Sequence, residues 1–170
     1  MNRAELERLR AIVDALAVPV PWSLSTFVAA LSAQRGRPIQ LHPLEGPTTA
    51  DTPTGLWVPS READYIFYET ATSLPHQEHI VCHELGHMVL RHQPDPERPG
   101  RYLHSRVFHQ VSPELVEIAR ARTSYRDAKE QEAETFATLI LRGATSRVRT
   151  GTAPPSPAAL QWSSVLGFDS

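Results

Sequence analysis

The sequence lacks the features that would mark a secreted, disulfide-stapled or membrane-embedded protein. One cysteine among 170 residues cannot form a disulfide within the chain, which is typical of a reducing compartment. No apolar run approaches the ~20 residues that a membrane-spanning helix needs. The first ten residues, MNRAELERLR, mix Glu and Arg and contain no apolar segment of a secretory signal. We therefore expect a cytoplasmic protein that has no membrane contact.

A strong charge of either sign is also missing. The formal net charge is −2, which argues against a protein whose main activity is direct nucleic-acid binding. Hydrophobic residues make up 41% and charged residues 21% of the chain, a composition that favours a folded globular protein over a disordered one. At 170 residues, the chain is long enough for one domain with a core and too short for two average ones.

Hydrophobic periodicity and turn residues divide the chain into short elements. Apolar residues recur at helical spacing over 3–17 and 23–34, and runs of β-branched and aromatic residues bounded by Pro, Gly and Ser predict strands. The predicted strands span 38–42, 55–58 and 64–69, and the later helices span 75–91, 113–121 and 125–141. This order predicts an α+β fold, in which a small three-stranded, mostly antiparallel sheet packs on helices.

The sequence predicts a single domain over residues 1–142, of which 1–35 form an N-terminal helical part. A loop is expected at 93–101, where three prolines and a glycine occur together. Residues 143–170 are rich in Ser, Thr and Pro, which predicts a flexible C-terminal tail.

The segment that carries chemistry lies in the predicted helix 75–91 and reads His83-Glu84-Leu85-Gly86-His87. Residues four apart lie on one face of a helix, about 6 Å apart along its axis, so both imidazoles can bind one ion. Glu84 lies beside them, where a carboxylate can act as general base. Gly86 stands where alanine would favour the helix by ~1 kcal/mol, which indicates close approach by another element. Two histidines make half of a catalytic zinc site, which needs a third protein ligand.

A second, acidic segment offers that third ligand. The predicted helix 125–141 contains KEQEAETFATLIL, in which Glu130, Glu132 and Glu134 accompany apolar residues such as Phe136. A carboxylate from this helix could complete a metal site, although three glutamates at alternate positions cannot all face inward. The residues alone leave the choice among these carboxylates open.

The two motifs together resemble the ImmA/IrrE-type metallopeptidases, zincins whose third ligand is a glutamate. This family has a His-Glu-x-Gly-His helix preceded by a small sheet, and a later helix with Glu-x-Glu-Ala-(Asn or Asp)-x-Phe-Ala. The resemblance covers residues 35–141 and implies a zincin-like fold with an active-site helix. It also implies Zn2+ bound by His83, His87 and Glu130, with Glu84 as the catalytic base.

Position 134 departs from the family pattern. Glu134 stands where the family has Asn or Asp, a group that orients a histidine ligand. Because the longer glutamate could itself reach a metal, both Glu130 and Glu134 are candidates for the third ligand. The spacing of the metzincins is absent, since positions 90 and 93 are Leu90 and Gln93.

The resemblance implies a zinc-dependent endopeptidase of narrow specificity, which cleaves or inactivates a separate helix-turn-helix repressor or antitoxin encoded nearby. Such a protein substrate requires no direct contact with nucleic acid or membrane, and the sequence specifies no oligomeric state. The third predicted strand, 64–69, precedes the active-site helix and is predicted to offer an edge to an extended peptide. The alternative function is a zinc-containing, non-proteolytic module that sequesters a partner protein.

Several other residues near the motifs have simpler interpretations. His79, one turn before His83, is expected to be a solvent-exposed or supporting histidine rather than a ligand. Cys82 is expected to be a small buried residue rather than a redox switch. The sequence does not single out an oxyanion-stabilising side chain. Its candidates are His92, His104, His109, Tyr102 and Tyr125.

Overall fold

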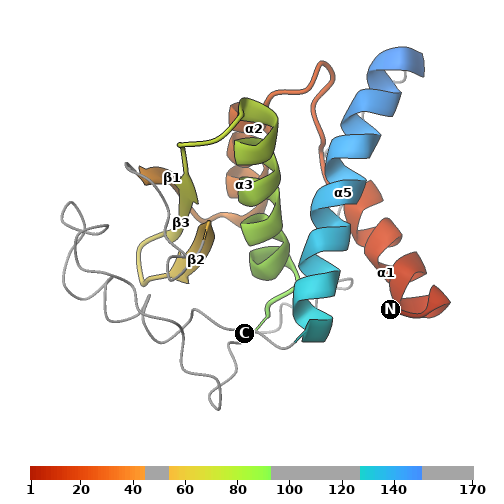
Figure 1. The fold of residues 1–170 in the computed structure, drawn as a ribbon, viewed down its shortest axis with the longest axis horizontal. Coiled ribbons are helices and arrows are strands. Elements are labelled where there is room, and N and C mark those ends of the chain that lie inside the picture. The colour runs from red at the N-terminus through yellow and green to blue at the C-terminus, as the bar shows by residue number, and fades with distance from the viewer. Residues whose placement is uncertain (45–53, 93–126, 151–170) are drawn as a thin grey trace.

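The computed structural model describes residues 1–44, 54–92 and 127–150, with side chains described as far as Ala144. These residues form four helices and three strands (Figure 1). The helices are α1 (Arg3–Asp14), α2 (Leu24–Arg35), α3 (Leu74–Val89) and α5 (Asp127–Thr150), and the strands are β1 (Ile39–Leu44), β2 (Gly55–Pro59) and β3 (Asp64–Glu69). The predicted loop 93–101 and the predicted helix 113–121 lie outside the described residues.

The elements are arranged in successive layers (Figure 1). α2 and α3 lie against the sheet, α5 lies beside α3, and α1 packs against α5 on the side away from the sheet. Large buried side chains from several layers share one core: Phe27, Trp57, Ile66, Leu85 and Phe136. α3 is therefore the central helix. In the part of the chain that the structure describes, no helix has both the length and the apolar character needed to cross a membrane.

The first two helices begin where their capping residues predict, and α1 ends at Asp14, three residues before the predicted end at 17. α1 starts with a capping box, in which Asn2 accepts from the Glu5 backbone N–H and the Glu5 carboxylate accepts from the Asn2 backbone N–H. α2 starts after the Ser23 cap and stops at Gly36, which adopts the left-handed conformation at φ 62°. Local capping residues therefore fix the start of both helices and the end of α2.

The sheet is mixed, in the order β1-β3-β2. β2 and β3 form an antiparallel hairpin, closed where the Ser60 N–H donates to the Ala63 carbonyl at 2.9 Å. β1 runs parallel to β3 on its other side, with Ile39 opposite Asp64. The α+β class and the three strands are thus confirmed, whereas the expected antiparallel pairing holds for only one of the two strand pairs. A sequence pattern marks a strand but does not identify its neighbour.

β3 is the central strand of the sheet. Because β3 pairs with β1 and β2 along its length, the prediction that residues 64–69 offer a free edge is wrong. Both β3 and the outer strand β2 contact α3. The backbone N–H of Trp57 donates to the Glu84 carboxylate at 2.8 Å, so this bond ties β2 to α3.

α5 is longer than the sequence predicts. The predicted helix ends at Leu141, but the observed helix continues through Gly143 to Thr150. A side chain added at Gly143 would meet no atom within 4 Å, so this glycine lies in the helix beside open space and does not end it. Glycine lowers helix propensity but does not by itself terminate a helix. The predicted end of this helix at Leu141 is therefore wrong. The flexibility of the tail stays a prediction, and residues 151–170 lie outside the described part.

A buried ion cluster fastens α2 to the sheet. Asp64, which is 1% exposed, lies at the start of β3 and accepts from the guanidinium groups of Arg35 and Arg37, each at 3.0 Å. Its other carboxylate oxygen accepts the indole N–H of Trp57 at 3.0 Å. The carboxylate is thus fully partnered at a buried position, where an unpaired charge would be costly.

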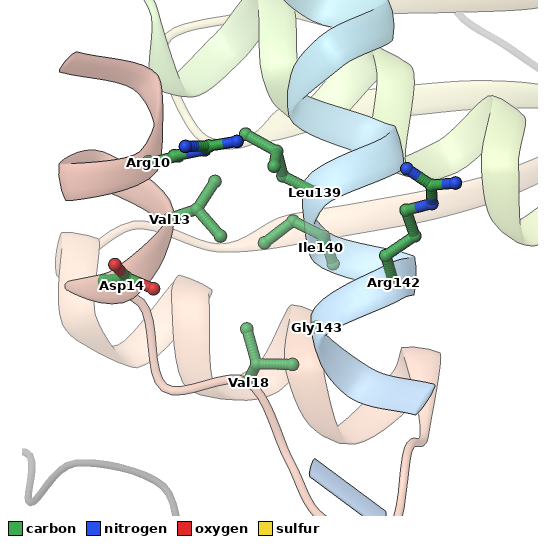
Figure 2. A pocket seen from close by; sticks show the side chains of 8 residues that line it. All are labelled: Arg10, Val13, Asp14, Val18, Leu139, Ile140, Arg142 and Gly143. Carbon is green, nitrogen blue, oxygen red and sulfur yellow. The ribbon is translucent and has the colours of Figure 1, made fainter. Parts of the chain in front are cut away.

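A groove of about 320 Å³ lies between α1 and α5 (Figure 2). Val13 and Ile140 are among the apolar side chains that line it, and the exposed Arg10 and Arg142 flank it. Ile140 follows Glu130 by ten residues, which corresponds to about 15 Å along the axis of α5. The groove is therefore separate from the histidine motif.

We expect the Asp64→Ala substitution to lower the free energy of unfolding by about 3–5 kcal/mol, because it leaves two arginines and an indole N–H without their acceptor. Glu7→Ala is the control, because it removes an exposed ion pair with Arg3 and should cost at most about 0.5 kcal/mol. Urea unfolding followed by circular dichroism measures both. Equal, small losses in the two variants would show that the cluster does not stabilise the fold.

Candidate metal centre

α3 presents both histidines of the motif toward α5. The opposite side of the helix is packed into the core by residues such as Val81 and Leu85, each 0% exposed. His83 and His87 lie one turn apart, with their Nε2 atoms separated by 3.0 Å. His87 is 1% exposed, whereas the side chain of His83 is 20% exposed. The pair is therefore buried at one end and accessible at the other.

α5 contributes a third group, Glu130, to the same point. Its Oε2 atom lies 3.2 Å from His83 Nε2, and its Oε1 atom lies 3.7 Å from His87 Nε2. One ligand atom from each residue lies within 4.8 Å of the other two. Among the described residues, His83, His87 and Glu130 form the group that could hold a metal ion. We call these three residues the trio.

Glu134 occupies a different position from Glu130. Its Oε2 atom lies 3.5 Å from His83 Nδ1, the nitrogen on the other side of the ring from the trio, and 3.0 Å from His79 Nε2. Of the two carboxylates that the sequence left open, the geometry therefore brings Glu130 to the two Nε2 atoms. Glu134 supports His83 from behind. His79 contacts Glu134, in agreement with its predicted supporting role.

Close packing of α3 on α5 makes the trio possible. A side chain added at Gly86 would lie 3.1 Å from the Phe136 ring, 3.2 Å from Ala133 Cα and 3.3 Å from the Ala133 carbonyl oxygen. Those distances are shorter than ordinary van der Waals contact, and two of the three atoms belong to the backbone of α5. The expected close approach at Gly86 is therefore real, and α5 is the element that makes it.

The side chain of Glu84 points toward β2, whereas Glu130 reaches the histidines from α5. Glu84 is 6% exposed, and its Oε2 atom accepts the Trp57 backbone N–H at 2.8 Å. Gly55 leaves room for it, because a side chain there would lie 2.7 Å from Glu84 Oε1 and 2.6 Å from Ile80. Burial raises the pKa of Glu84, although His87 and His83 act in the opposite direction. The carboxyl group thus lies beside the histidines in a low-dielectric setting.

The pKa values of Glu130 and His83 are shifted by their neighbours in the site. Burial raises the pKa of Glu130, but its hydrogen bonds with His83 and His87 outweigh burial and bring the pKa down to about 2. Burial lowers the pKa of His83, and Glu130, Glu84 and Glu134 reverse this effect, so the pKa ends above its usual value. Glu130 is therefore anionic near neutral pH, as a carboxylate ligand must be.

The sequence did not predict the contacts of His92. Its Nδ1 atom lies 2.9 Å from His87 Nδ1, and its Nε2 atom lies 3.0 Å from Glu132 Oε2. Burial, with help from His87, lowers the pKa of His92 to about 4. Because the ring contacts the back of His87, its position does not favour the oxyanion role for which it was one candidate. The other candidates, His104, His109, Tyr102 and Tyr125, lie outside the described residues.

Cys82 has the structural role that the sequence predicts. Its side chain is 0% exposed in the core. Burial, with a smaller contribution from Glu78, raises the pKa of the thiol far above its usual range. A thiol that stays protonated is a poor nucleophile and a poor metal ligand, so Cys82 is a packing residue.

We expect the same substitution to have opposite effects at two helical glycines. Gly143→Ala should raise the free energy of unfolding by about 0.5–1 kcal/mol, because alanine favours a helix and the site is open. Gly86→Ala should lower it by about 1–2 kcal/mol, because the new methyl group presses on the α5 backbone. Thermal and urea unfolding of the two variants test this. A gain in stability at position 86 equal to that at position 143 would contradict the close packing.

Comparison of the chain with protein-family models, with curated proteins and with solved structures gave no match in any of the three. No relative therefore supplies an activity, a metal or a partner. The resemblance to a metallopeptidase family rests on the two motifs, and the structure adds that residues of both motifs meet in space. Function is accordingly inferred from the chemistry that His83, His87, Glu130 and their neighbours can perform.

Proposed function

We propose that this chain is a zinc-dependent peptidase whose metal is held by His83, His87 and Glu130. The observation that carries the proposal is the spacing of the ligand atoms. Zinc bonds of ~2.0–2.1 Å in tetrahedral geometry place neighbouring ligand atoms ~3.3 Å apart. Here the two Nε2 atoms are 3.0 Å apart, and the distances from them to the Glu130 oxygens are 3.2 and 3.7 Å. Each of these distances is close to the value for zinc, and His83 and His87 lie near different oxygens of the Glu130 carboxylate.

The donor set also suits a catalytic zinc ion. Imidazole nitrogen and carboxylate oxygen are both common zinc ligands, and three protein ligands leave one position for water or substrate. Structural zinc sites use four protein ligands. The partial exposure of His83 and Glu130 gives a substrate access to this position. When bound there, zinc would polarise a peptide carbonyl and acidify a water molecule.

Glu84 is the general base in this proposal. It precedes Leu85 on the same helix as both histidines, and their charges act on its pKa. The Trp57 N–H fixes one carboxylate oxygen, and the other can accept a proton from a water molecule and return it to the leaving amine. Burial moves the pKa of Glu84 up toward the operating pH, which improves a general base.

The resemblance to ImmA/IrrE-type metallopeptidases supplies the proposed substrate class. We propose that the substrate is a separate helix-turn-helix repressor or antitoxin, encoded near this chain. The alternative is a zinc-containing module that sequesters such a partner without cleaving it. A buried carboxylate beside the trio favours the peptidase, because a sequestering module has no need of a base at Glu84.

The first test concerns the metal. We expect the purified chain to bind one zinc ion, measured by elemental analysis after dialysis. His83→Ala and Glu130→Gln should lose stoichiometric zinc, because each removes a ligand atom. Glu134→Gln is the matched control on the same helix, and it should retain zinc because Glu134 contacts His79 Nε2 and His83 Nδ1 and neither of the facing Nε2 atoms of the trio. A parent chain without zinc, or loss of zinc in Glu134→Gln but not in Glu130→Gln, would contradict the assignment.

The second test concerns hydrolysis. We expect Glu84→Gln to keep zinc and to slow cleavage by about 10²–10⁴-fold, because the glutamine cannot accept the proton. Its side-chain oxygen can still accept the Trp57 N–H, so the fold is preserved. The assay is co-expression with the neighbouring repressor, followed by mass spectrometry of the fragments. Cleavage by Glu84→Gln at the parental rate would exclude this mechanism, and capture of an intact repressor by both chains would favour the sequestering module.

A further inference from the structure

The C-terminal end of α3 forms a turn that folds back on the helix. The Arg91 N–H donates to the Met88 carbonyl at 3.2 Å, and the His92 N–H donates to the His87 carbonyl at 2.9 Å. With Leu90 as the C-cap, these are the two hydrogen bonds of a Schellman motif. Arg91 adopts the left-handed conformation, φ 53°, at the position that glycine usually occupies. A residue with a side chain is strained there, which makes the turn a candidate for a functional role.

This turn brings together the two residues that close it, His87 and His92. In Schellman motifs the corresponding pair frequently makes an apolar contact. Here the two residues are imidazoles, with ring centroids 5.0 Å apart and Nδ1 atoms 2.9 Å apart. Two ring nitrogens at this distance can share a hydrogen bond only if one carries a proton and the other offers a lone pair.

The partner of His92 determines which ring donates. His92 is 4% exposed, and its Nε2 atom lies 3.0 Å from Glu132 Oε2. An ionised carboxylate can only accept, so the proton of a neutral His92 is at Nε2 and its Nδ1 atom offers the lone pair. The His87 proton is then at Nδ1. Consequently His87 Nε2 carries the lone pair, and this atom faces His83 and Glu130.

We propose that His92 and Glu132 are positioning residues, which hold His87 in the tautomer and orientation that a metal ion requires. This inference rests on the metal site of the proposed function. It concerns the opposite side of the site from Glu134, which contacts His83. His87 is thus oriented by a histidine that is itself oriented by a carboxylate. The turn at Arg91 supplies the backbone geometry, and α5 supplies Glu132.

The chain of contacts reaches the surface through α1. Glu132 Oε1 lies 3.0 Å from a guanidinium nitrogen of Arg8, whose side chain is 57% exposed. An ion pair with so much solvent around one partner contributes little to the orientation of the other. The effect of substitutions should therefore be largest at His92, smaller at Glu132 and smallest at Arg8.

The experiment compares His92→Leu with His92→Gln. Leucine restores the apolar contact that is usual in this turn but offers no acceptor, whereas glutamine keeps a side-chain oxygen that can accept the His87 Nδ1–H. Zinc affinity is measured by competition with a chromophoric chelator. We expect His92→Leu to fold and to bind zinc about 10–100-fold more weakly than the parent. His92→Gln should recover most of the affinity, and Arg8→Ala should stay within about twofold of the parent.

A second readout does not depend on zinc. Long-range nitrogen–proton NMR of the metal-free chain, at a pH where the rings are neutral, reports which nitrogen of His87 is protonated. We expect Nδ1–H in the parent and a shift toward Nε2–H in His92→Leu, because a neutral histidine side chain without a partner at Nδ1 favours the Nε2–H tautomer. If the parent bound no zinc, the proposed function would fail while this readout still decided the positioning role. An Nε2–H tautomer in the parent, or equal zinc affinity in parent and His92→Leu, would overturn the inference.

Discussion

The contact between α3 and α5 at Gly86 is the constraint on which the candidate site depends. Helices with ordinary side chains pack about 8–10 Å apart, and here the α5 backbone at Ala133 takes the space of a side chain at position 86. Glu130 lies one turn before Ala133, and the two histidines of the motif flank Gly86 on either side. The glycine contact therefore places one glutamate within reach of both rings. A bulkier residue at position 86 would separate the ligands along with the helices.

Contacts between glutamates and histidines offset the repulsion among carboxylates at this tight interface between α3 and α5. α5 carries three glutamates at alternate positions, and each contacts different ring nitrogens. Glu130 contacts the two facing Nε2 atoms, Glu134 contacts His79 Nε2 and His83 Nδ1, and Glu132 contacts His92 Nε2. Successive alternate positions differ by about 200° around a helix, so Glu132 diverges from the other two and reaches the end of α3. Carboxylates at such close quarters would repel one another without the rings between them.

Much of the fold follows from local sequence signals. The helices, the three strands and the α+β class were predictable because periodicity and turn residues act over a few positions. Two features were not. The parallel pairing of β1 with β3 depends on contacts between distant segments. The continuation of α5 through Gly143 depends on the neighbouring residues, which sustain the helix even though one glycine weakens it.

The residues of the candidate site also differ in how far local sequence signals predict them. His83 and His87 were predictable because their spacing alone places both rings on one helical face, and Glu130 shared the third position with Glu134 until the geometry separated them. His92 was not predictable as a partner of His87. The two are five positions apart, whereas neighbours on a helix face are three or four apart, so their contact requires the helix to stop and the chain to fold back. That turn requires the left-handed conformation at position 91, where the sequence has Arg91 and not the glycine that would predict it. Sequence patterns do not predict a strained turn that contains no glycine. Strained backbone of this kind tends to occur at functional sites.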